Sequence, residues 1–329
     1  MTFPGRFLLL AGALFCTASS IAQTAPACEA PWPPKVVRIV SPYPPGGSAD
    51  MIARQIASRL GERLHSSFIV ENRPGAGGNI ASEWVVRAAA DGSVLLLGVS
   101  GPIAINPSLY KRMSFQPQKD LKPVMLLASE PYVLYVNPST GIRTVGELVA
   151  QLKAKPAAFS YASAGPGSTA QLAAERFRAA TGTQMMHVPY KGGVPALTDV
   201  VAGVVPLTFA AVTGYTYANA GKLNALAITG PNRSAFLPKV PTLREAGIGD
   251  ADTTIWYGLL APAGTSGAIV ERIRRETAVA MAQPEVQKAL RDYGIEDDSK
   301  GSSEDFRHLI ETETLRWSRI VQATGTTLD

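Results

Sequence analysis

The sequence contains little of what metal or redox chemistry requires, because only two cysteines and three histidines occur in 329 residues. No His-Glu-x-x-His motif and no Cys/His cluster is present, so we expect neither a zinc centre nor a cofactor. His187 lies within an apolar run, where a packed histidine is a better expectation than a general base. Metal-dependent and cofactor-dependent enzymes are therefore disfavoured.

Apolar runs of membrane-spanning length are also scarce. The run from Phe7 to Phe15 is too short to cross a bilayer, and it precedes the small-x-small sequence Ser20-Ile21-Ala22, a pattern typical of a cleaved secretory signal. We expect a signal peptide over residues 1–22, a flexible Ala/Pro-rich leader over residues 23–34, and a mature protein outside the cytoplasmic membrane. Removal of the signal leaves Cys28 alone, so no intramolecular disulfide is expected.

A concentrated basic stripe, which a nucleic-acid surface needs, is missing as well: the net charge is +5 and the basic residues are scattered. Catalytic motifs fail in detail. Gly98-Val99-Ser100-Gly101 resembles a hydrolase elbow, but its second glycine falls one residue early. The run from Gly75 to Ile80 has two glycines of a dinucleotide fingerprint and Ile80 in place of the third. We therefore expect these loops to bind a ligand without any chemical step, and we expect no catalytic residue.

Extended apolar segments alternate with amphipathic helices along the chain, which predicts the α/β class. Strands are expected over Val36–Tyr43, Phe68–Glu71 and Ser93–Val99, with helices between them, as βαβ units around a mostly parallel sheet. The first helix repeats its apolar residues every four positions, at Ile52, Ile56, Leu60 and Leu64.

The middle of the chain predicts a second α/β layer, and about three hundred residues are more typical of two domains than of one. Two extended segments, Val124–Ala128 and Tyr132–Val136, carry the chain out of the first domain, and a strand over Ile255–Ala261 returns it. Three amphipathic helices follow. The expected limits are therefore residues 35–131 and 255–329 for domain 1, and residues 132–254 for domain 2.

Two strand-to-helix loops carry the strongest functional signal. In the loop from Ser41 to Asp50, prolines fix the backbone at the entry to the turn, and glycines permit close approach of the backbone to a ligand. The first N–H groups of the next helix are unpaired and point into the space where a ligand would lie. A similar loop runs from Ser163 to Thr169. Such loops are common in α/β proteins and serve as simple turns. Two such loops on one exported chain favour a clamp for a small carboxylate. Ser48 and Asp50 are also residue types that cap the start of a helix, so a purely structural role is expected for them as well.

Several motifs in a fixed order resemble the Bug family, the substrate-binding proteins of tripartite tricarboxylate transporters, over nearly the whole mature chain. The segments that carry the resemblance are Pro44–Asp50, Val70–Asn79, Ala104–Tyr110, Val188–Asp199, Ala220–Ala227, Val240–Thr242 and Trp256–Thr265.

The resemblance implies a periplasmic binding protein of type II, with two α/β domains joined by crossing strands and the ligand cleft between them. It further implies a monomer that binds a small organic acid and delivers it to membrane permease subunits, without nucleic acid, metal or cofactor. A sensory role, with the closed receptor docking on a membrane sensor kinase, needs the same clamp and stays open. An enzyme on the same fold is the third and weakest alternative.

The residues expected to contact the ligand come from the two loops, from the end of the strand before Ser100 and from two later segments. They are Tyr43, Gly46, Gly47, Ser48, Ala49, Ser100, Ser163, Ala164, Gly165, Ser168, Thr169, Tyr190 and Ala210. Lys191 is expected to be solvated. Because Ala210 and Ala211 stand where some family members have an acidic or amide residue suited to an amino group, we expect a non-amino carboxylate as ligand.

Overall fold

The computed structural model describes residues 1–2, 32–156, 158–249, 251–324 and 327, and residues from Trp32 onward form one compact unit. Residues 3–22 of the predicted signal peptide and residues 23–31 of the predicted leader, including both cysteines, lie outside the described residues. Trp32 itself is buried, and its Nε1–H donates a hydrogen bond to the Gly92 carbonyl at 3.0 Å. The last three residues of the predicted leader, 32–34, therefore belong to the folded unit.

Within the described residues of this unit, ten strands form one sheet in the order β2-β1-β3-β9-β4-β7-β5-β6, with β8 and β10 pairing to β4 beside that path. The strands are β1 (Val36–Ser41), β2 (Ser67–Asn72), β3 (Val94–Val99), β4 (Leu121–Val136), β5 (Ser160–Ser163), β6 (Met186–Pro189), β7 (Leu207–Ala211), β8 (Asn224–Ile228), β9 (Thr254–Pro262) and β10 (Glu296–Asp297).

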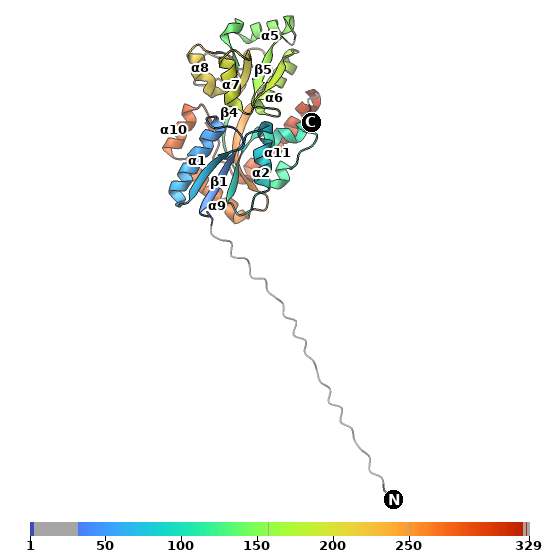
Figure 1. The fold of residues 1–329 in the computed structure, drawn as a ribbon, viewed down its shortest axis with the longest axis vertical. Coiled ribbons are helices and arrows are strands. Elements are labelled where there is room, and N and C mark those ends of the chain that lie inside the picture. Colours follow the sequence, from blue (N-terminus) through green and yellow to red (C-terminus); the bar gives the residue numbers. More distant parts are fainter. Residues whose placement is uncertain (3–31, 157, 250, 325–326, 328–329) are drawn as a thin grey trace. The chain divides into compact units, whose positions relative to one another are not determined.

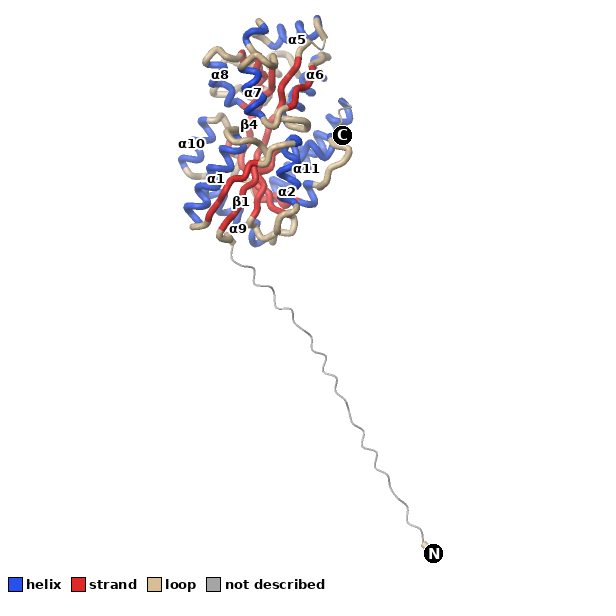
Figure 2. Tube along the Cα trace, in the orientation of Figure 1, coloured by secondary structure: helices blue, strands red, loops and turns tan. Residues whose placement is uncertain are grey.

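Helices cover both faces of this sheet (Figure 2). They are α1 (Ser48–Leu64), α2 (Asn79–Val86), α3 (Asn106–Leu109), α4 (Pro117–Asp120), α5 (Val145–Ala154), α6 (Thr169–Thr181), α7 (Gly193–Val201), α8 (Tyr215–Asn219), α9 (Gly267–Met281), α10 (Pro284–Asp292) and α11 (Ser303–Thr324). Helices α5 to α8 gather around one end of the sheet, and α1, α2 and α9 to α11 around the other (Figure 1). None of the described helices is both long enough and apolar enough to cross a membrane.

The two extended segments predicted on either side of Pro131 are one continuous strand, β4, which is 16 residues long. Its residues 121–131 pair with β9, and its residues 132–136 pair with β7 and β8. We call the sheet formed by β1, β2, β3, β9, β10 and residues 121–131 the first half. We call the sheet formed by β5 to β8 and residues 132–136 the second half.

The predicted α/β class is confirmed, but the expectation of a mostly parallel sheet is wrong in the middle. Strand β1 pairs in parallel with β2 and β3, and β5 pairs in parallel with β6 and β7, as βαβ units require. Strands β4 and β9 instead run antiparallel to each other and to their outer neighbours β7 and β3. The sheet is mixed because the chain leaves the first half along β4 and returns along β9.

A glycine of β9 allows α11 to pack on the centre of the first half. Gly98 of β3 lies opposite Gly258 of β9, and the fully buried ring of Phe306 on α11 occupies the space that a Cβ at Gly258 would fill. The same ring meets Trp256 edge-on, with the centroids 5.4 Å apart. Helix α11 can approach β9 this closely because Gly258 has no Cβ atom.

Gly258→Ala should therefore destabilise the protein by about 1–3 kcal/mol, because the added methyl overlaps a ring that has no free space to move into. Gly146→Ala is the matched control: this exposed glycine of α5 has nothing within 4 Å of its Cβ position. That control should leave stability unchanged or raise it by up to about 1 kcal/mol. Urea unfolding of both variants measures the difference, and equal stabilities would contradict the packing argument.

Candidate functional site

The loop between β1 and α1 leaves the start of a long helix open. The N-cap of α1 is Gly47, and no side chain among the described residues bonds to the first N–H groups of the helix. The expected capping role of Ser48 is wrong, since Ser48 is the first helical residue. Asp50 turns back instead and accepts a hydrogen bond from the Gly46 N–H at 3.1 Å. The N-terminus of a 17-residue helix therefore keeps its partial positive charge available for an anion.

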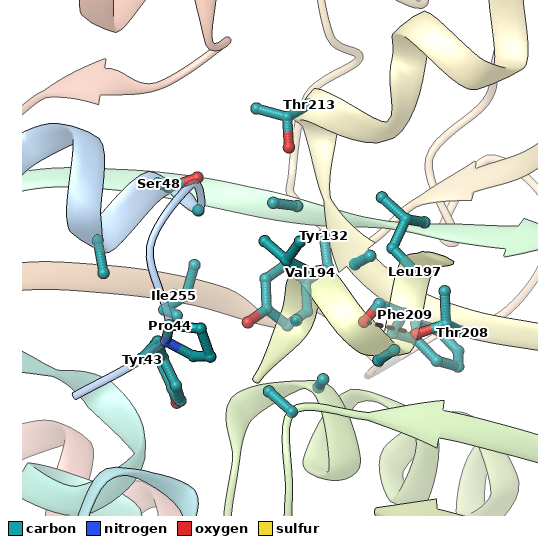
Figure 3. A pocket seen from close by; sticks show the side chains of 18 of the residues that line it. Tyr43, Pro44, Ser48, Tyr132, Val194, Leu197, Thr208, Phe209, Thr213 and Ile255 are labelled. Carbon is teal, nitrogen blue, oxygen red and sulfur yellow. Dashed lines mark hydrogen bonds between the residues drawn. The ribbon is translucent and has the colours of Figure 1, made fainter. Parts of the chain in front are cut away.

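A pocket of about 100 Å³ lies between this loop and the second half. Figure 3 shows Tyr43, Pro44 and Ser48 from the β1–α1 loop on one side, Leu197 and Thr213 on the other, and Tyr132 between them. The lining residues are Tyr43, Pro44, Gly46–Ala49, Tyr132, Ala164, Ala170, Gly193, Val194, Ala196, Leu197, Thr208–Ala211, Thr213, Ile255 and Tyr257. Since one water needs roughly 10–15 Å³, the volume suits a single small ligand.

Seven of the thirteen residues expected at the site line this pocket, namely Tyr43, Gly46, Gly47, Ser48, Ala49, Ala164 and Ala210. The other six, namely Ser100, Ser163, Gly165, Ser168, Thr169 and Tyr190, do not belong to its lining. Lys191 is exposed. Most of the second expected loop therefore lies outside the pocket.

The second loop satisfies its own polar groups. Ser168 caps α6 by accepting from the Gln171 N–H at 3.4 Å, and Gln171 Oε1 accepts in return from the Gly167 N–H at 2.7 Å. Ser163 Oγ lies 2.5 Å from His187 Nε2 and also bonds within the loop to Gly165. The reciprocal bonds between Gln171 and residues 167 and 168 resemble a capping box, and they leave fewer donors for a ligand than the start of α1 does.

The same loop joins the second half to the first. The Ser100 and Thr169 hydroxyl oxygens are 2.9 Å apart and both residues are fully buried. Tyr110 donates from its hydroxyl to the Pro166 carbonyl at 3.1 Å. These two contacts hold the two halves of the sheet together beside the pocket. Tyr190 is engaged elsewhere, since its hydroxyl donates to Asp199 at 2.6 Å.

The floor of the pocket was missed by sequence reasoning. Tyr132 of β4 and Tyr257 of β9 both line it, and both are at least nine-tenths buried. The available signal was a tyrosine in each of two largely apolar strands, because a buried tyrosine hydroxyl usually has a hydrogen-bond partner. Burial raises the pKa of both hydroxyls, so both stay neutral.

A buried carboxyl group lies behind these tyrosines. Glu130 of β4 is 0% exposed, and its Oε1 accepts a hydrogen bond from the Tyr257 hydroxyl at 2.5 Å. Burial raises the pKa of Glu130 to about 7, and the neighbouring Tyr257 and Ser48 hydroxyls moderate that rise. This group changes its charge in the neutral pH range, next to two residues of the pocket wall.

The lining itself is uncharged: none of the lining side chains in the described parts of the chain is acidic or basic. The nearby Asp50 is paired with Arg54 at 2.9 Å. Burial alone would raise the pKa of Asp50. Hydrogen bonds from Arg54, Asn72 and the Gly46 N–H nevertheless hold that pKa below its ordinary value. No group of three or more metal-ligating side chains is found within the described residues. The pocket thus offers N–H groups, hydroxyls and apolar walls.

Known proteins are similar to this chain in sequence and in fold. A family model described as "Tripartite tricarboxylate transporter family receptor" matches residues 52–326. BugT of Bordetella pertussis is 33% identical over 325 residues, which are 98% of this chain and 98% of BugT.

Two solved structures are similar over most of the chain. R. palustris Rpa4515, solved with adipate, has a TM-score of 0.86 and 34% identity, covering 90% of this chain and 99% of its own. MatC from Rhodopseudomonas palustris, solved with bound malate, has a TM-score of 0.83 and 29% identity, covering 87% of this chain and 98% of its own.

Glu130→Gln should remove a pH dependence of folding stability. The folded protein holds the Glu130 proton up to about pH 7, whereas the ordinary value in an unfolded chain is 4.5. The associated stability is therefore fully present below the lower value and is lost as pH rises through the higher one. Urea unfolding at about pH 5 and about pH 8 should show the variant gaining about 2–3 kcal/mol on the wild type at the higher pH.

The exposed Glu311→Gln provides the matched control for loss of one carboxylate, and it should follow the wild-type pH profile. Identical profiles for the wild type and Glu130→Gln would contradict the raised pKa.

Proposed function

The chain belongs to the tripartite tricarboxylate transporter receptor family, and from this premise we propose that it captures a small organic carboxylate in the pocket and delivers it to a membrane permease. The resemblance to the Bug family that the sequence motifs indicate is confirmed by the family match and by BugT. The binding-protein fold class is confirmed by the solved relatives. The observation that carries the proposal is the uncapped start of α1 facing an uncharged pocket. No covalent step is part of this function.

A carboxylate suits the donors that the pocket presents. The first turn of α1 supplies N–H groups and a partial positive charge, and Ser48 adds a hydroxyl at the same point. Hydrogen bonds from such groups hold an anion without a counter-ion. The structural relatives solved with adipate and with malate bind dicarboxylic acids, which supports the same ligand class here.

The opposite wall favours an apolar ligand body without an amino group. Val194, Leu197 and Phe209 form apolar surface there, and Ala210 and Ala211 present methyl groups. An ammonium group would lose its hydration against this wall without gaining a carboxylate as its counter-ion. A non-amino carboxylate is therefore the proposed ligand, held by its acid group at α1 and by its carbon chain against the second half.

The proposed ligand contacts are the seven expected residues that line the pocket, together with Tyr132, Thr208, Thr213 and Tyr257. We assign Ser100, Ser163, Gly165, Ser168, Thr169 and Tyr190 to the neighbouring loop and inter-half contacts, since their polar groups already have partners there or lie outside the lining.

Closure between two domains is the proposed mode of capture. The domains are residues 35–131 with 255–329, and residues 132–254, which correspond to the two halves of the sheet with their helices. They share β4, and the chain returns from the second half to the first at the start of β9, so rotation about these two connections would open the pocket. The proposed setting is the periplasm, after removal of residues 1–22, with the protein acting as a monomer beside permease subunits.

The first test is thermal unfolding of the mature protein, freed of ligand by refolding, against mono-, di- and tricarboxylates, aromatic acids and amino acids. An acid that binds only the folded state at a hundredfold excess over its Kd adds roughly 2.7 kcal/mol of stability. We expect stabilisation by one group of non-amino acids. A response to amino acids alone would overturn the ligand class, and no response to any carboxylate would overturn the function.

Ala210→Asp should weaken binding of the acid found in that screen by at least about tenfold, because it places a carboxylate in the pocket wall facing an anion. Ala158→Asp adds the same charge at an exposed loop position and serves as the control. Isothermal titration gives both affinities. Equal values for the two variants would remove Ala210 from the ligand's surroundings.

A further inference from the structure

The buried carboxyl of Glu130 touches the pocket through two of its lining residues. Tyr257 donates to Oε1 at 2.5 Å, and the Ser48 hydroxyl is close enough to influence the same carboxyl. Both Tyr257 and Ser48 line the pocket, whereas Glu130 does not. Glu130 can therefore act on a ligand only through these hydroxyls and through its charge.

Two oxygen atoms at this point make no hydrogen bond of normal geometry, although the Ser48 hydroxyl is close enough to the Glu130 carboxyl to influence its pKa. Among the described residues, Glu130 Oε2 and Ser48 Oγ are both buried without a hydrogen bond. Ser48 is 6% exposed and Glu130 is 0% exposed, so neither oxygen has bulk water as a substitute partner. Buried polar atoms are rarely left unpaired, and one such atom in the pocket lining with a second directly behind it indicates that a ligand or a proton completes the network.

We propose that Glu130 is a positioning residue that takes up a proton when the carboxylate ligand binds, and that its neutral form directs the Ser48 hydroxyl toward the ligand. This inference rests on the proposed function. The proton comes from solvent, and it forms the O–H bond of the Glu130 carboxylic acid without any bond of the ligand being broken.

Hydrogen-bond direction gives the mechanism. An ionised Glu130 only accepts, so it draws the protons of both neighbouring hydroxyls toward itself, and Ser48 then turns lone pairs toward the pocket. A neutral Glu130 donates its own proton to Ser48 Oγ, so the Ser48 proton becomes free to point into the pocket. Only the second arrangement gives an anionic ligand a donor in place of lone pairs.

Charge acts in the same direction. The N-terminus of α1 favours one negative charge, and an ionised Glu130 competes for it with the ligand's carboxylate. The other titratable groups facing Glu130 are Tyr257 from β9 and Tyr132 and Tyr135 from β4, all kept neutral by burial. On α1, Asp50 and Arg54 pair with each other. None of these described groups supplies a cation to Glu130, so protonation is the available route to neutrality.

The proposal predicts that the ligand binds more weakly as pH rises. Glu130 in the free protein releases its proton at about pH 7, and the bound ligand raises that value further. Binding is then accompanied by proton uptake, and Kd increases about tenfold between about pH 6.5 and about pH 8.5 if the ligand raises the pKa by more than one unit. Aliphatic carboxylic acids are already ionised over this range, so the ligand itself contributes little to the change.

The experiment is isothermal titration of the mature protein with adipate and with malate across that pH range, in two buffers of different ionisation enthalpy, which reports the protons taken up. Glu130→Gln keeps an acceptor for Tyr257 and a donor for Ser48, so it should bind with the wild type's low-pH affinity at every pH and without proton uptake. Glu311→Gln, which changes an exposed carboxylate, should keep the wild-type pH profile.

A merely structural Glu130 would give the same pH profile in the wild type and in Glu130→Gln, and that outcome would falsify the proposal. A constant wild-type Kd with no proton uptake overturns it as well. If neither acid nor any other carboxylate of the screen shows saturable binding, the proposed function itself has failed. That result is distinct from saturable binding that does not respond to pH.

Discussion

Main-chain hydrogen bonding along β4 changes partner between Pro131 and Tyr132, and the position of the pocket depends on that change. Up to Pro131 the strand pairs with β9, and from Tyr132 it pairs with β7. Pro131 has no N–H, and the Tyr132 N–H donates to Thr229 Oγ1 at 2.8 Å rather than to a backbone carbonyl. One strand therefore serves both halves, and the residues at the change of partner, Glu130 and Tyr132, lie at or behind the pocket floor.

The order of helices and strands could be predicted from the sequence because each element carries a local signal. The four-residue repeat of α1 and the apolar run of β3 are examples, and both elements lie within a few residues of the expected limits. The continuity of β4 could not be predicted, since Pro123 and Pro131 interrupt its pattern and prolines favour strand ends. A register shift between Pro123 and Met125 accommodates the first of them.

The candidate site could likewise be predicted only where its residues are adjacent in sequence. The β1–α1 loop was recognisable because its prolines and glycines are adjacent in sequence, and seven of the expected residues line the pocket. The same signals in the second loop gave a different result, since Gln171 bonds to Gly167 and Ser168 caps the helix. Glu130 and Tyr257 could not be brought together by sequence reasoning. They meet only because β4 and β9 pair over a separation of more than a hundred residues.

An uncharged binding wall also has a consequence for the medium in which the receptor works. Salt bridges at a surface are screened by dissolved ions, and the Debye length is only about 8 Å at physiological ionic strength. In the proposed binding mode, helix N–H groups and hydroxyls of the pocket hold the acid without a mobile counter-ion to exchange. Under that proposal, ligand retention depends less on ionic strength than retention by a surface salt bridge does. A receptor built in this way keeps its affinity when the salinity of the surroundings changes.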